Sequence, residues 1–306
     1  MGDFHCPMGA AFYDDDGCID CRLCSAMTKE EIIEATNKIR KYLRAHAPKE
    51  IVSKKIAVSG KGGVGKSTVV TLMARAFKEA GYTVLVIDTD ESNPGLFRMF
   101  GFDRQPTPLV KTLERFALGE VKADTEWLRQ ELIPVESIPT EYILEDGDIK
   151  FLMVGKIEDP LQGCACSMAD LTRDLVGKLL VKDGEMVLVD MEAGIESFGR
   201  GVERSVDTVL VIVEPSFESL VLAEKIVYMA EGIGINRVRA ILNKVPSSGI
   251  EDRIIEKLKE KSIKFVGTIY YDSQLNEDGF EGRALGESKA KEEMKKITRR
   301  LIDEKK

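Results

Sequence analysis

Long apolar runs are missing from this 306-residue chain, and so is any cysteine outside two short clusters. No stretch approaches the roughly 20 apolar residues of a membrane-spanning helix, and the N-terminus lacks the apolar segment of a secretory signal. Basic residues are outnumbered, since 44 Lys and Arg stand against 52 Asp and Glu and give a net charge of −8. Because a phosphate backbone requires a basic face, we expect a cytoplasmic protein that binds neither membranes nor nucleic acid.

Cysteine is clustered rather than scattered through the predicted core. One cluster holds Cys6, Cys18, Cys21 and Cys24, and the other holds Cys164 and Cys166. Thiols stay reduced in the cytoplasm, which leaves little use for disulfides there. Clustered thiols of this kind therefore indicate metal ligands.

The chain from residue 55 onward alternates short apolar runs with helical patterns. The apolar runs that suit buried parallel strands are Ile56–Ser59, Val84–Asp88, Phe151–Val154, Met186–Asp190, Val209–Val213, Ala240–Asn243 and Lys264–Ile269. Helical patterns cover 67–80, 168–181, 217–231 and 249–260, and a charged helix from Ser288 to Glu304 is expected to dock on the sheet. This alternation predicts an α/β fold with a doubly wound, mostly parallel sheet and helices on both faces.

Residues 1–50 differ from the rest and predict a small Cys-rich extension with one helix. Thr28 is placed to cap that helix, and Glu31 completes a capping box. Residues 51–306 then form one large domain. Within it, residues 103–150 break the alternation with several prolines and predict an insertion of helices and loops.

A P-loop joins the first predicted strand of the large domain to its first helix. The residues expected to surround the nucleotide phosphates are Gly60, Gly62, Gly63, Val64, Gly65, Lys66, Ser67 and Thr68. Lys66 would place its charge on the β- and γ-phosphates, and the Ser67 hydroxyl would bind Mg²⁺. An ordinary Gly-rich turn would rarely have a strand before it and a helix after it, so the pattern predicts binding of ATP and Mg²⁺.

Lys61 is a second lysine inside the P-loop. It sits on the outer lip of the loop, where its side chain would point away from the nucleotide bound by its own chain. Its natural target is a nucleotide held by a second copy. The loop therefore predicts a dimer bridged by nucleotide, with Lys61 and Lys66 both serving catalysis.

Acidic residues end two of the predicted strands. Asp88 and Asp90 close one strand and Asp190 closes another, and ligands of α/β sheets bind at such strand ends. Acids there can orient the attacking water or hold Mg²⁺, and Asp190 fits the outer-sphere Mg²⁺ carboxylate of a Walker B strand. A lone aspartate would more simply cap a turn, but the P-loop favours the functional interpretation.

Weaker candidates surround this predicted site. Gly194, Gly199 and Gly201 make the loop after Asp190 a candidate switch that senses the γ-phosphate. Asn243 ends a strand and could contact the base edge. Tyr270 and Tyr271 follow the last strand and could flank the base, although simple packing at the rim explains them equally well.

The residues then resemble a known family. Lys61 within Gly60–Thr68 marks the deviant Walker A ATPases, a group that holds septum-site and plasmid-partition ATPases and the nitrogenase iron protein. Three further runs narrow the resemblance, which covers about residues 55–290: Asp190–Gly201, Val213–Leu220 and Gly163–Cys166. Together they look like the nickel-insertion ATPases of carbon monoxide dehydrogenase, the CooC type.

That resemblance implies a two-fold homodimer closed by ATP, with Lys61 acting across the interface and Asp90 near the hydrolytic water. It also implies a metal bound between subunits by Cys164 and Cys166. The chain departs from the family in two ways. The run Glu91–Asn93 stands where Asp-Pro-Asn is usual, and the Cys-rich extension is additional, which leaves the metal cargo open.

Cys164 and Cys166 supply two thiolates, whereas tetrahedral thiolate sites need four. Two copies on a two-fold axis would supply the other two. Closure on ATP would then assemble a site for nickel or zinc, and opening would loosen it. The alternative is a pair of buried structural cysteines, but the pair follows Gly163 in a predicted loop.

The N-terminal thiols have a different spacing. A tight Cys-x-x-Cys-x-x-Cys run with a distant fourth thiol resembles the ligand set of a 4Fe–4S cluster. It also looks like the cluster motif of iron–sulfur scaffold ATPases, where the last spacing is longer. Zinc is the alternative because four thiolates also satisfy Zn²⁺, and His5 could replace one of them.

Three functions compete at this point. The leading hypothesis is an ATPase that matures a client metalloenzyme, such as carbon monoxide dehydrogenase, by handling nickel or a related soft metal. A second is an ATP-dependent iron–sulfur reductase or cluster carrier, which the N-terminal cysteines favour. A third is a positioning ATPase that binds membrane or DNA, against which the acidic charge and the paired thiols count.

Overall fold

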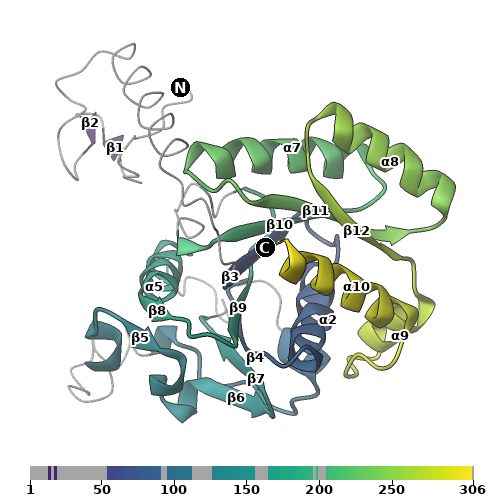
Figure 1. Ribbon diagram of the computed structural model, residues 1–306. Helices are drawn as coiled ribbons and strands as arrows, with labels where there is room; N and C mark the ends of the chain where they lie inside the picture. Colours follow the sequence, from purple (N-terminus) through teal and green to yellow (C-terminus); the bar gives the residue numbers. More distant parts are fainter. Residues whose placement is uncertain are drawn as a thin grey trace.

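The computed structural model describes residues 13–14, 17–18, 54–90, 95–111, 126–155, 165–195, 198 and 205–304. The strands of the central sheet are β3 (Lys55–Gly60), β4 (Thr83–Asp88), β6 (Ile143–Asp146), β7 (Ile149–Met153), β9 (Glu185–Asp190), β10 (Thr208–Val213), β11 (Val238–Val245) and β12 (Phe265–Tyr270). They form one eight-stranded sheet in the order β12-β11-β10-β3-β9-β4-β7-β6 (Figure 1). Neighbouring strands run parallel except β6 and β7, which confirms the predicted fold class.

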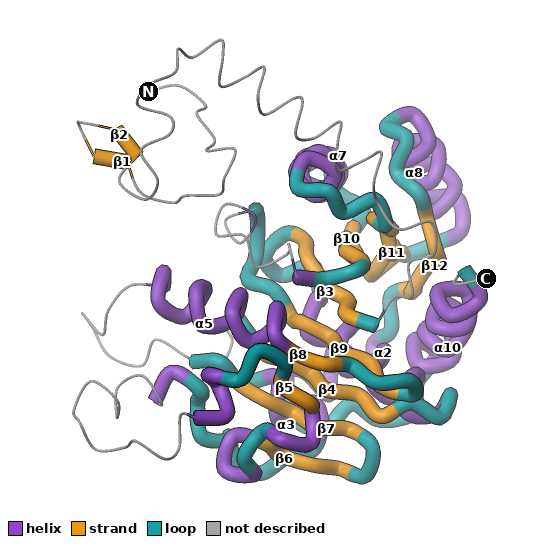
Figure 2. Tube along the Cα trace, turned by 60° about the vertical axis from the view of Figure 1, so that its left-hand side comes forward, coloured by secondary structure: helices purple, strands orange, loops and turns teal. Residues whose placement is uncertain are grey.

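Helices cover both faces of this sheet. They are α2 (Lys66–Glu79), α3 (Leu96–Phe100), α5 (Ala165–Lys178), α7 (Phe217–Gly232), α8 (Ser248–Glu260), α9 (Ser273–Phe280) and α10 (Lys289–Asp303). Buried side chains of α5, α7 and α8 belong to one apolar cluster, and those of α2, α3 and α10 belong to another. Figure 2 shows α5 on one side of the sheet and α2 with α10 on the other.

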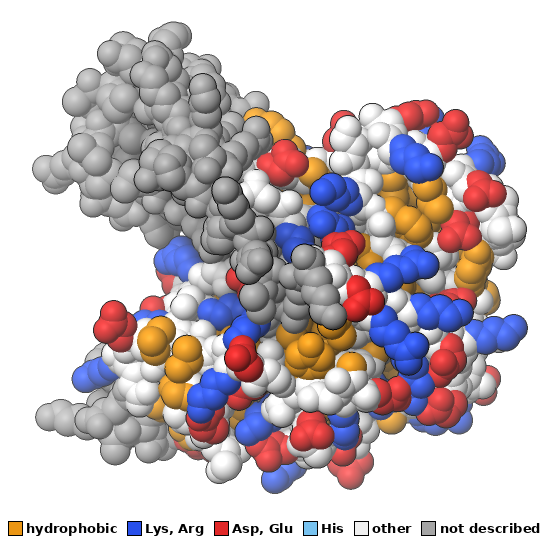
Figure 3. Space-filling view, viewed as in Figure 1, with side chains coloured by type: hydrophobic (Ala, Val, Ile, Leu, Met, Phe, Trp, Pro, Cys, Tyr) orange, Lys and Arg blue, Asp and Glu red, His pale blue; other side chains and the backbone are white. Residues whose placement is uncertain are grey.

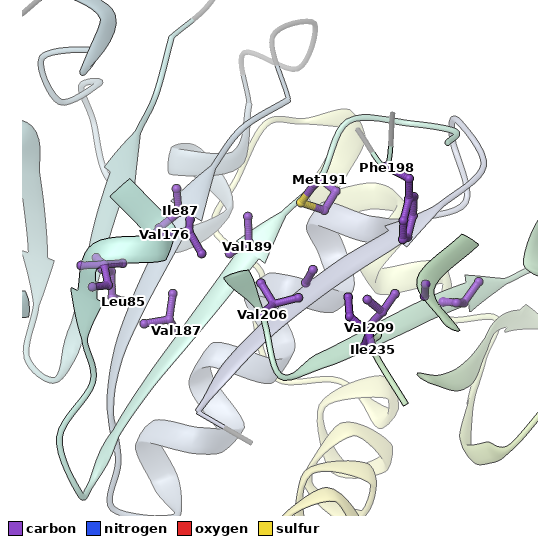
Figure 4. Packing of buried hydrophobic residues seen from close by; sticks show 14 of the residues in the cluster. Leu85, Ile87, Val176, Val187, Val189, Met191, Phe198, Val206, Val209 and Ile235 are labelled. Atoms are coloured by element: carbon purple, nitrogen blue, oxygen red, sulfur yellow. The ribbon is translucent and has the colours of Figure 1, made fainter. Parts of the chain in front are cut away.

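Strict alternation along the strands builds the two clusters. In β3, Ile56 and Val58 face the α2 side, whereas Ala57 faces the α5 side. Figure 4 shows part of the cluster on the α5 side, to which Val187 and Val189 of β9 and Val176 of α5 belong. Both faces of each central strand are therefore apolar, which is why the strands appear in the sequence as continuous apolar runs.

The order of the strands reverses at β3, which lies between β9 and β10. The chain passes from β3 to β4 on one side, returns to β9, and then crosses to β10 on the other side. In doubly wound sheets the carboxyl ends of the strands at such a reversal leave a crevice where ligands bind. The loop after β3 opens at this point.

The charged C-terminal helix docks on the sheet, as predicted. In α10 the buried side chains are Ala290, Met294, Ile297, Thr298 and Leu301, and this face contacts α2 and β12. Two of its charged side chains, Glu293 and Arg300, bond to backbone groups of β12. On the face seen in Figure 3, basic and acidic side chains are interspersed.

Some elements differ from the sequence prediction. Helix α5 begins at Ala165 and ends at Lys178, and β8 (Leu179–Leu180) then pairs with β5 (Ile133–Pro134), so the predicted helix over 168–181 was placed too late. The stretch 103–150, expected to hold helices and loops, also contributes the edge strand β6. Helices α3 and α9 had not been predicted.

The N-terminal prediction lies mostly outside the described residues. Only β1 (Tyr13–Asp14) and β2 (Gly17–Cys18) are described there, and they pair antiparallel. The helix expected after Thr28 is not among the described residues. Of the helices in the described ranges, none has the length and apolarity to cross a membrane.

Candidate functional site

The loop between β3 and α2 needs glycine at both of its ends. Gly60 has a φ of 153°, and a Cβ there would lie 2.8 Å from the carbonyl oxygen of Ile212. Gly65 caps α2 in the left-handed region at a φ of 95°, and a Cβ there would lie 2.4 Å from Nδ2 of Asn243. A side chain at either position would force the backbone to move, so this sequence is matched to one loop conformation.

Other parts of the fold hold the loop by its carbonyl groups. The amide Nδ2 of Asn243 donates to the carbonyl of Val64 at 2.8 Å, and Nζ of Lys244 donates to that of Gly63 at 2.6 Å. The N–H of Gly194 donates to the carbonyl of Gly60 at 3.1 Å. With its carbonyls engaged elsewhere, the loop has the arrangement in which N–H groups can surround an anion.

The two residues that begin α2 are buried at the mouth of this loop. Lys66 is 6% exposed and Ser67 is 8% exposed. The hydroxyl of Ser67 donates to Oδ2 of Asp190 across a distance of 2.6 Å. In the rest of the loop Val64 is buried, Thr68 is half-buried, and Gly62 and Gly63 are exposed. The lysine and the serine thus lie where a bound phosphate chain would end.

Acidic side chains from two neighbouring strands meet beside Ser67. Asp88 and Asp190 are register partners on β4 and β9, and Asp90 follows two residues after Asp88. All three are buried, with exposures of 2%, 7% and 0% for Asp88, Asp90 and Asp190. The N–H of Asp90 donates to Oδ1 of Asp88 at 3.2 Å. The structure thus brings the three acids together at the carboxyl ends of two adjacent strands, and their role at a nucleotide site remains a prediction.

Asp190 carries the clearest electrostatic signal. Burial, with Asp88 as the next contributor, raises the pKa of the Asp190 carboxyl to about 7. Its Oδ2 accepts the hydrogen bond from Ser67, whereas its Oδ1 is buried and has no hydrogen-bond partner among the described groups. A buried carboxylate oxygen of this kind is costly unless a cation or a donor arrives.

These residues fit a magnesium nucleotide. The buried carboxylates and the Ser67 hydroxyl are oxygen donors, which Mg²⁺ prefers, and Asp190 has an oxygen to spare. The glycine-rich loop and Lys66 fit the phosphates. Ser67, Asp88 and Asp190 are therefore the residues that could hold the metal ion.

Lys61 has a partner that the sequence analysis did not identify. Its Nζ lies 3.2 Å from Oε1 of Glu214, the residue that follows β10, and the Lys61 side chain is 39% exposed. Because β3 and β10 are neighbours, both residues stand at the same edge of the sheet. In the structure, Lys61 is thus paired with a carboxylate of its own chain. Its action on the nucleotide of a second copy remains a prediction.

The candidates for the base differ in availability. Asn243 is 5% exposed, and its Nδ2 is committed to the loop. The hydroxyl of Tyr270 donates to Glu251, and this bond raises the pKa of Tyr270 to about 12. Tyr271 is 57% exposed. Of the two tyrosines, Tyr271 is therefore the one with the more exposed side chain.

Most of the predicted metal thiols fall outside the described residues. Cys6, Cys21, Cys24 and Cys164 belong to that group. Cys18 is described as part of strand β2 and Cys166 as part of helix α5, by backbone alone. Cys166 therefore lies in a helix and not in the loop that the sequence analysis expected.

Two residues of the site were given no role in the sequence analysis. Lys244 adopts a positive φ of 56° beside Asn243, and only the structure shows that its side chain reaches the loop. Glu214 lies 153 positions from Lys61, so no local pattern joins them. The switch loop after Asp190 is described only through residue 195 and at residue 198.

Comparisons with known proteins agree with this geometry. The model of the CobQ/CobB/MinD/ParA nucleotide binding domain matches residues 55–285. An uncharacterised ATP-binding protein of Methanocaldococcus jannaschii is 39% identical over 242 residues, covering 76% of this chain and 93% of that protein. The carbon monoxide dehydrogenase accessory protein CooC of Rhodospirillum rubrum is 35% identical over 228 residues, covering 72% of this chain and 85% of that protein.

A solved structure extends the likeness to the fold. The MinC:MinD cell division protein complex of Aquifex aeolicus has a chain that matches with a TM-score of 0.61 at 18% identity, covering 82% of this chain and 96% of that chain. At this identity the likeness concerns the fold alone. Given the matched model and the two relatives, the chain belongs to the CobQ/CobB/MinD/ParA family of nucleotide-binding domains.

Proposed function

We propose that this protein is a cytoplasmic ATPase whose two copies close on ATP and deliver a metal ion to a client metalloenzyme of the carbon monoxide dehydrogenase type. The likeness to the CooC accessory protein, at 35% identity over 85% of that protein, carries the proposal. The complete phosphate site supports the ATPase part, because the buried lysine, hydroxyl and carboxylates are those that hydrolysis of a triphosphate needs.

Within each chain, the residues divide the work on the nucleotide. Lys66 holds the β- and γ-phosphates, and Ser67 with Asp88 and Asp190 holds Mg²⁺. When bound, Mg²⁺ neutralises charge that develops on the phosphates. Asp90 orients the attacking water. The carbonyl oxygen of Asn243 accepts from the amino group of adenine, and the ring of Tyr271 flanks the base.

The metal is the cargo of this cycle. Cys164 and Cys166 of each copy supply two thiolates, so a closed pair supplies the four that nickel or zinc would take in a tetrahedral thiolate site. Lys61 of one copy contacts the nucleotide of the other, which links closure to ATP. The N-terminal set of Cys6, Cys18, Cys21 and Cys24 holds a 4Fe–4S cluster or zinc.

Anaerobic purification with and without Mg-ATP tests the whole cycle. Light scattering should show a monomer that becomes a dimer with ATP, and metal analysis should find about one additional metal ion per dimer. The Cys166→Ser variant should lose that ion and still dimerise. A wild-type protein that stays monomeric with ATP, or a Cys166→Ser variant with unchanged metal content, would contradict the proposal.

The N-terminal thiols provide a matched control. A Cys21→Ser variant should keep the ATP-dependent metal and lose iron with acid-labile sulfide, or lose zinc, depending on what that set binds. If the ATP-dependent metal is instead iron with sulfide, the chain is a cluster carrier and not a nickel-handling protein.

A further inference from the structure

We propose that Glu214 is a positioning residue that holds Lys61 on its own chain until a second copy brings a nucleotide. This inference rests on the proposed ATP-driven pairing. The observation behind it is the contact of 3.2 Å between Nζ of Lys61 and Oε1 of Glu214. Lys61 follows β3 and Glu214 follows β10, so the ends of adjacent parallel strands bring the two charges together.

The carboxylate is the fixed member of this ion pair. The N–H of Glu214 donates to Oγ of Ser219 at 3.1 Å, and the Ser216 hydroxyl donates to Oε1 of Glu214 at 3.4 Å. Ser216 in turn caps α7 by accepting from the N–H of Ser219 at 3.3 Å. The Glu214 backbone and carboxylate are thus each tied to the N-terminal end of α7.

The lysine is the member that can leave. It stands on the loop next to the exposed Gly62 and Gly63, and its own side chain is 39% exposed, against 22% for Glu214. A partly exposed ion pair of this kind contributes little to folding, because water solvates both groups well once they separate. The ion pair therefore contributes little to the stability of the fold. Its main effect is on the position of the Lys61 ammonium group.

Two anions then compete for one ammonium group. In the single chain the carboxylate of Glu214 holds it. When two copies meet, the triphosphate of the second copy offers several negative charges, and Lys61 exchanges one partner for the other. Dimerisation therefore requires that the Lys61–Glu214 contact be broken. Glu214 thereby raises the nucleotide concentration at which two chains dimerise.

The test is a titration of dimer formation with a non-hydrolysable ATP analogue and Mg²⁺, followed by light scattering. Glu214→Gln keeps the shape and removes the charge, so it should lower the analogue concentration at half-dimerisation by about two- to fivefold. Glu218→Gln removes an exposed charge from the first turn of α7, where Glu218 has no contact with Lys61 among the described pairs, and should match the wild type.

A double-mutant cycle separates the ion pair from a general effect on α7. In a Lys61→Ala background the Glu214→Gln change should have no effect on the remaining dimerisation or on nucleotide affinity. Raising the salt concentration should also shrink the difference between wild type and Glu214→Gln. A structural role for Glu214 in capping α7 would persist in both conditions.

The outcomes separate this inference from the proposed function. If the wild type dimerises with the analogue and Glu214→Gln has the same or a higher midpoint, the role of Glu214 is wrong while ATP-driven pairing stands. If the wild type itself stays monomeric, pairing is wrong and this inference falls with it. Glu214→Asp, which keeps the charge, should stay close to the wild type if Glu214→Gln proves unstable.

Discussion

The two ends of the central sheet both carry charged residues, but they use them in opposite ways. At the carboxyl end Asp190 is fully buried, and one of its oxygens has no hydrogen-bond partner among the described groups. At the amino end one carboxylate oxygen of Asp207 accepts from the N–H groups of Lys54 at 3.0 Å and Lys55 at 2.8 Å. The carboxyl end therefore has a buried carboxyl oxygen that a ligand could engage, whereas the carboxylate at the amino end already accepts hydrogen bonds from the protein itself.

The lysines at the amino end follow the same principle. Nζ of Lys55 donates to the carbonyl of Val176 at 2.7 Å, and Nζ of Lys54 donates to that of Val181 at 3.2 Å. Burial lowers the pKa of Lys55, and Asp207 partly offsets this effect. A polar group with its partners in place stabilises the native state, whereas one without them is a cost that binding can relieve. The comparison predicts that changes at the two ends separate activity from stability.

The largest effect is expected from Lys66→Met at the carboxyl end. Hydrolysis of ATP should fall by about 10³-fold, because the charge that faces the phosphates is lost. The thermal midpoint of the ligand-free protein should hold or rise, since a buried ammonium is removed. Steady-state phosphate release and thermal unfolding measure the two effects. A thermal midpoint that falls as far as that of Asp207→Ala, described below, would contradict the separation of activity from stability between the two ends.

Asp190→Asn should make the ligand-free protein less sensitive to pH. The folded-state pKa of about 7 lies above the ordinary value of 3.8, so in wild type the unfolded chain releases this proton first as the pH rises. Wild-type stability contributed by this group is therefore present below pH 4 and is lost as the pH rises to 7. Relative to wild type, the variant should gain on the order of 2–4 kcal/mol between pH 4 and pH 8.

Denaturant titrations at several pH values, without Mg²⁺ or nucleotide, measure that gain. A difference between Asp190→Asn and wild type that stays constant from pH 4 to pH 8 would mean that the pKa of Asp190 is not raised in the folded protein.

Asp207→Ala should show the reverse pattern at the amino end. Two backbone N–H groups lose a charged acceptor, which should lower the free energy of unfolding by about 2 kcal/mol. Nucleotide affinity should not change, because Asp207 and the phosphate loop lie at opposite ends of the parallel strands β10 and β3. Calorimetric binding of the ATP analogue at low temperature tests this. A tenfold loss of affinity would contradict the division between the two ends.

The smallest effect is expected from Asp183→Asn. Nζ of Lys54 reaches Asp183 at 2.8 Å, and this bond lowers the pKa of the Asp183 carboxyl, but that side chain is fully exposed. Exposed pairs of this kind contribute little. The thermal midpoint should be indistinguishable from wild type at neutral pH, and a clear drop would show that charges at the amino end are more tightly coupled than their exposure suggests.

Most of the fold could be predicted because its strands are buried on both faces. The run Val209–Val213 is apolar throughout, Val84–Asp88 is apolar up to its final acid, and every strand predicted from such a run is present. Strand β6 was missed because it lies at the edge of the sheet and has two exposed acidic residues, Glu145 and Asp146. Short helices such as α3 give too few turns for a periodic pattern.

The site divides in the same way between local and distant signals. The phosphate loop is a contiguous motif, so its residues could be predicted one by one. The acids at the strand ends required only the rule that ligands meet there. Two other contacts join residues that are distant in the sequence. Lys61 and Glu214 are separated by 153 positions, and Asn243 and Val64 by 179. Which side chains meet at such separations depends on the packing of the folded chain.

The distance between Val64 and Asn243 along the chain also bears on synthesis. A polypeptide leaves the ribosome from its N-terminus, so the glycine-rich loop emerges long before β11, which carries the amide that pins it. A nascent chain that stops short of β11 has the phosphate-binding sequence but lacks Asn243, whose amide donates to the carbonyl of Val64. The loop therefore gains the hydrogen bonds from Asn243 and Lys244 only after β11 has been synthesised.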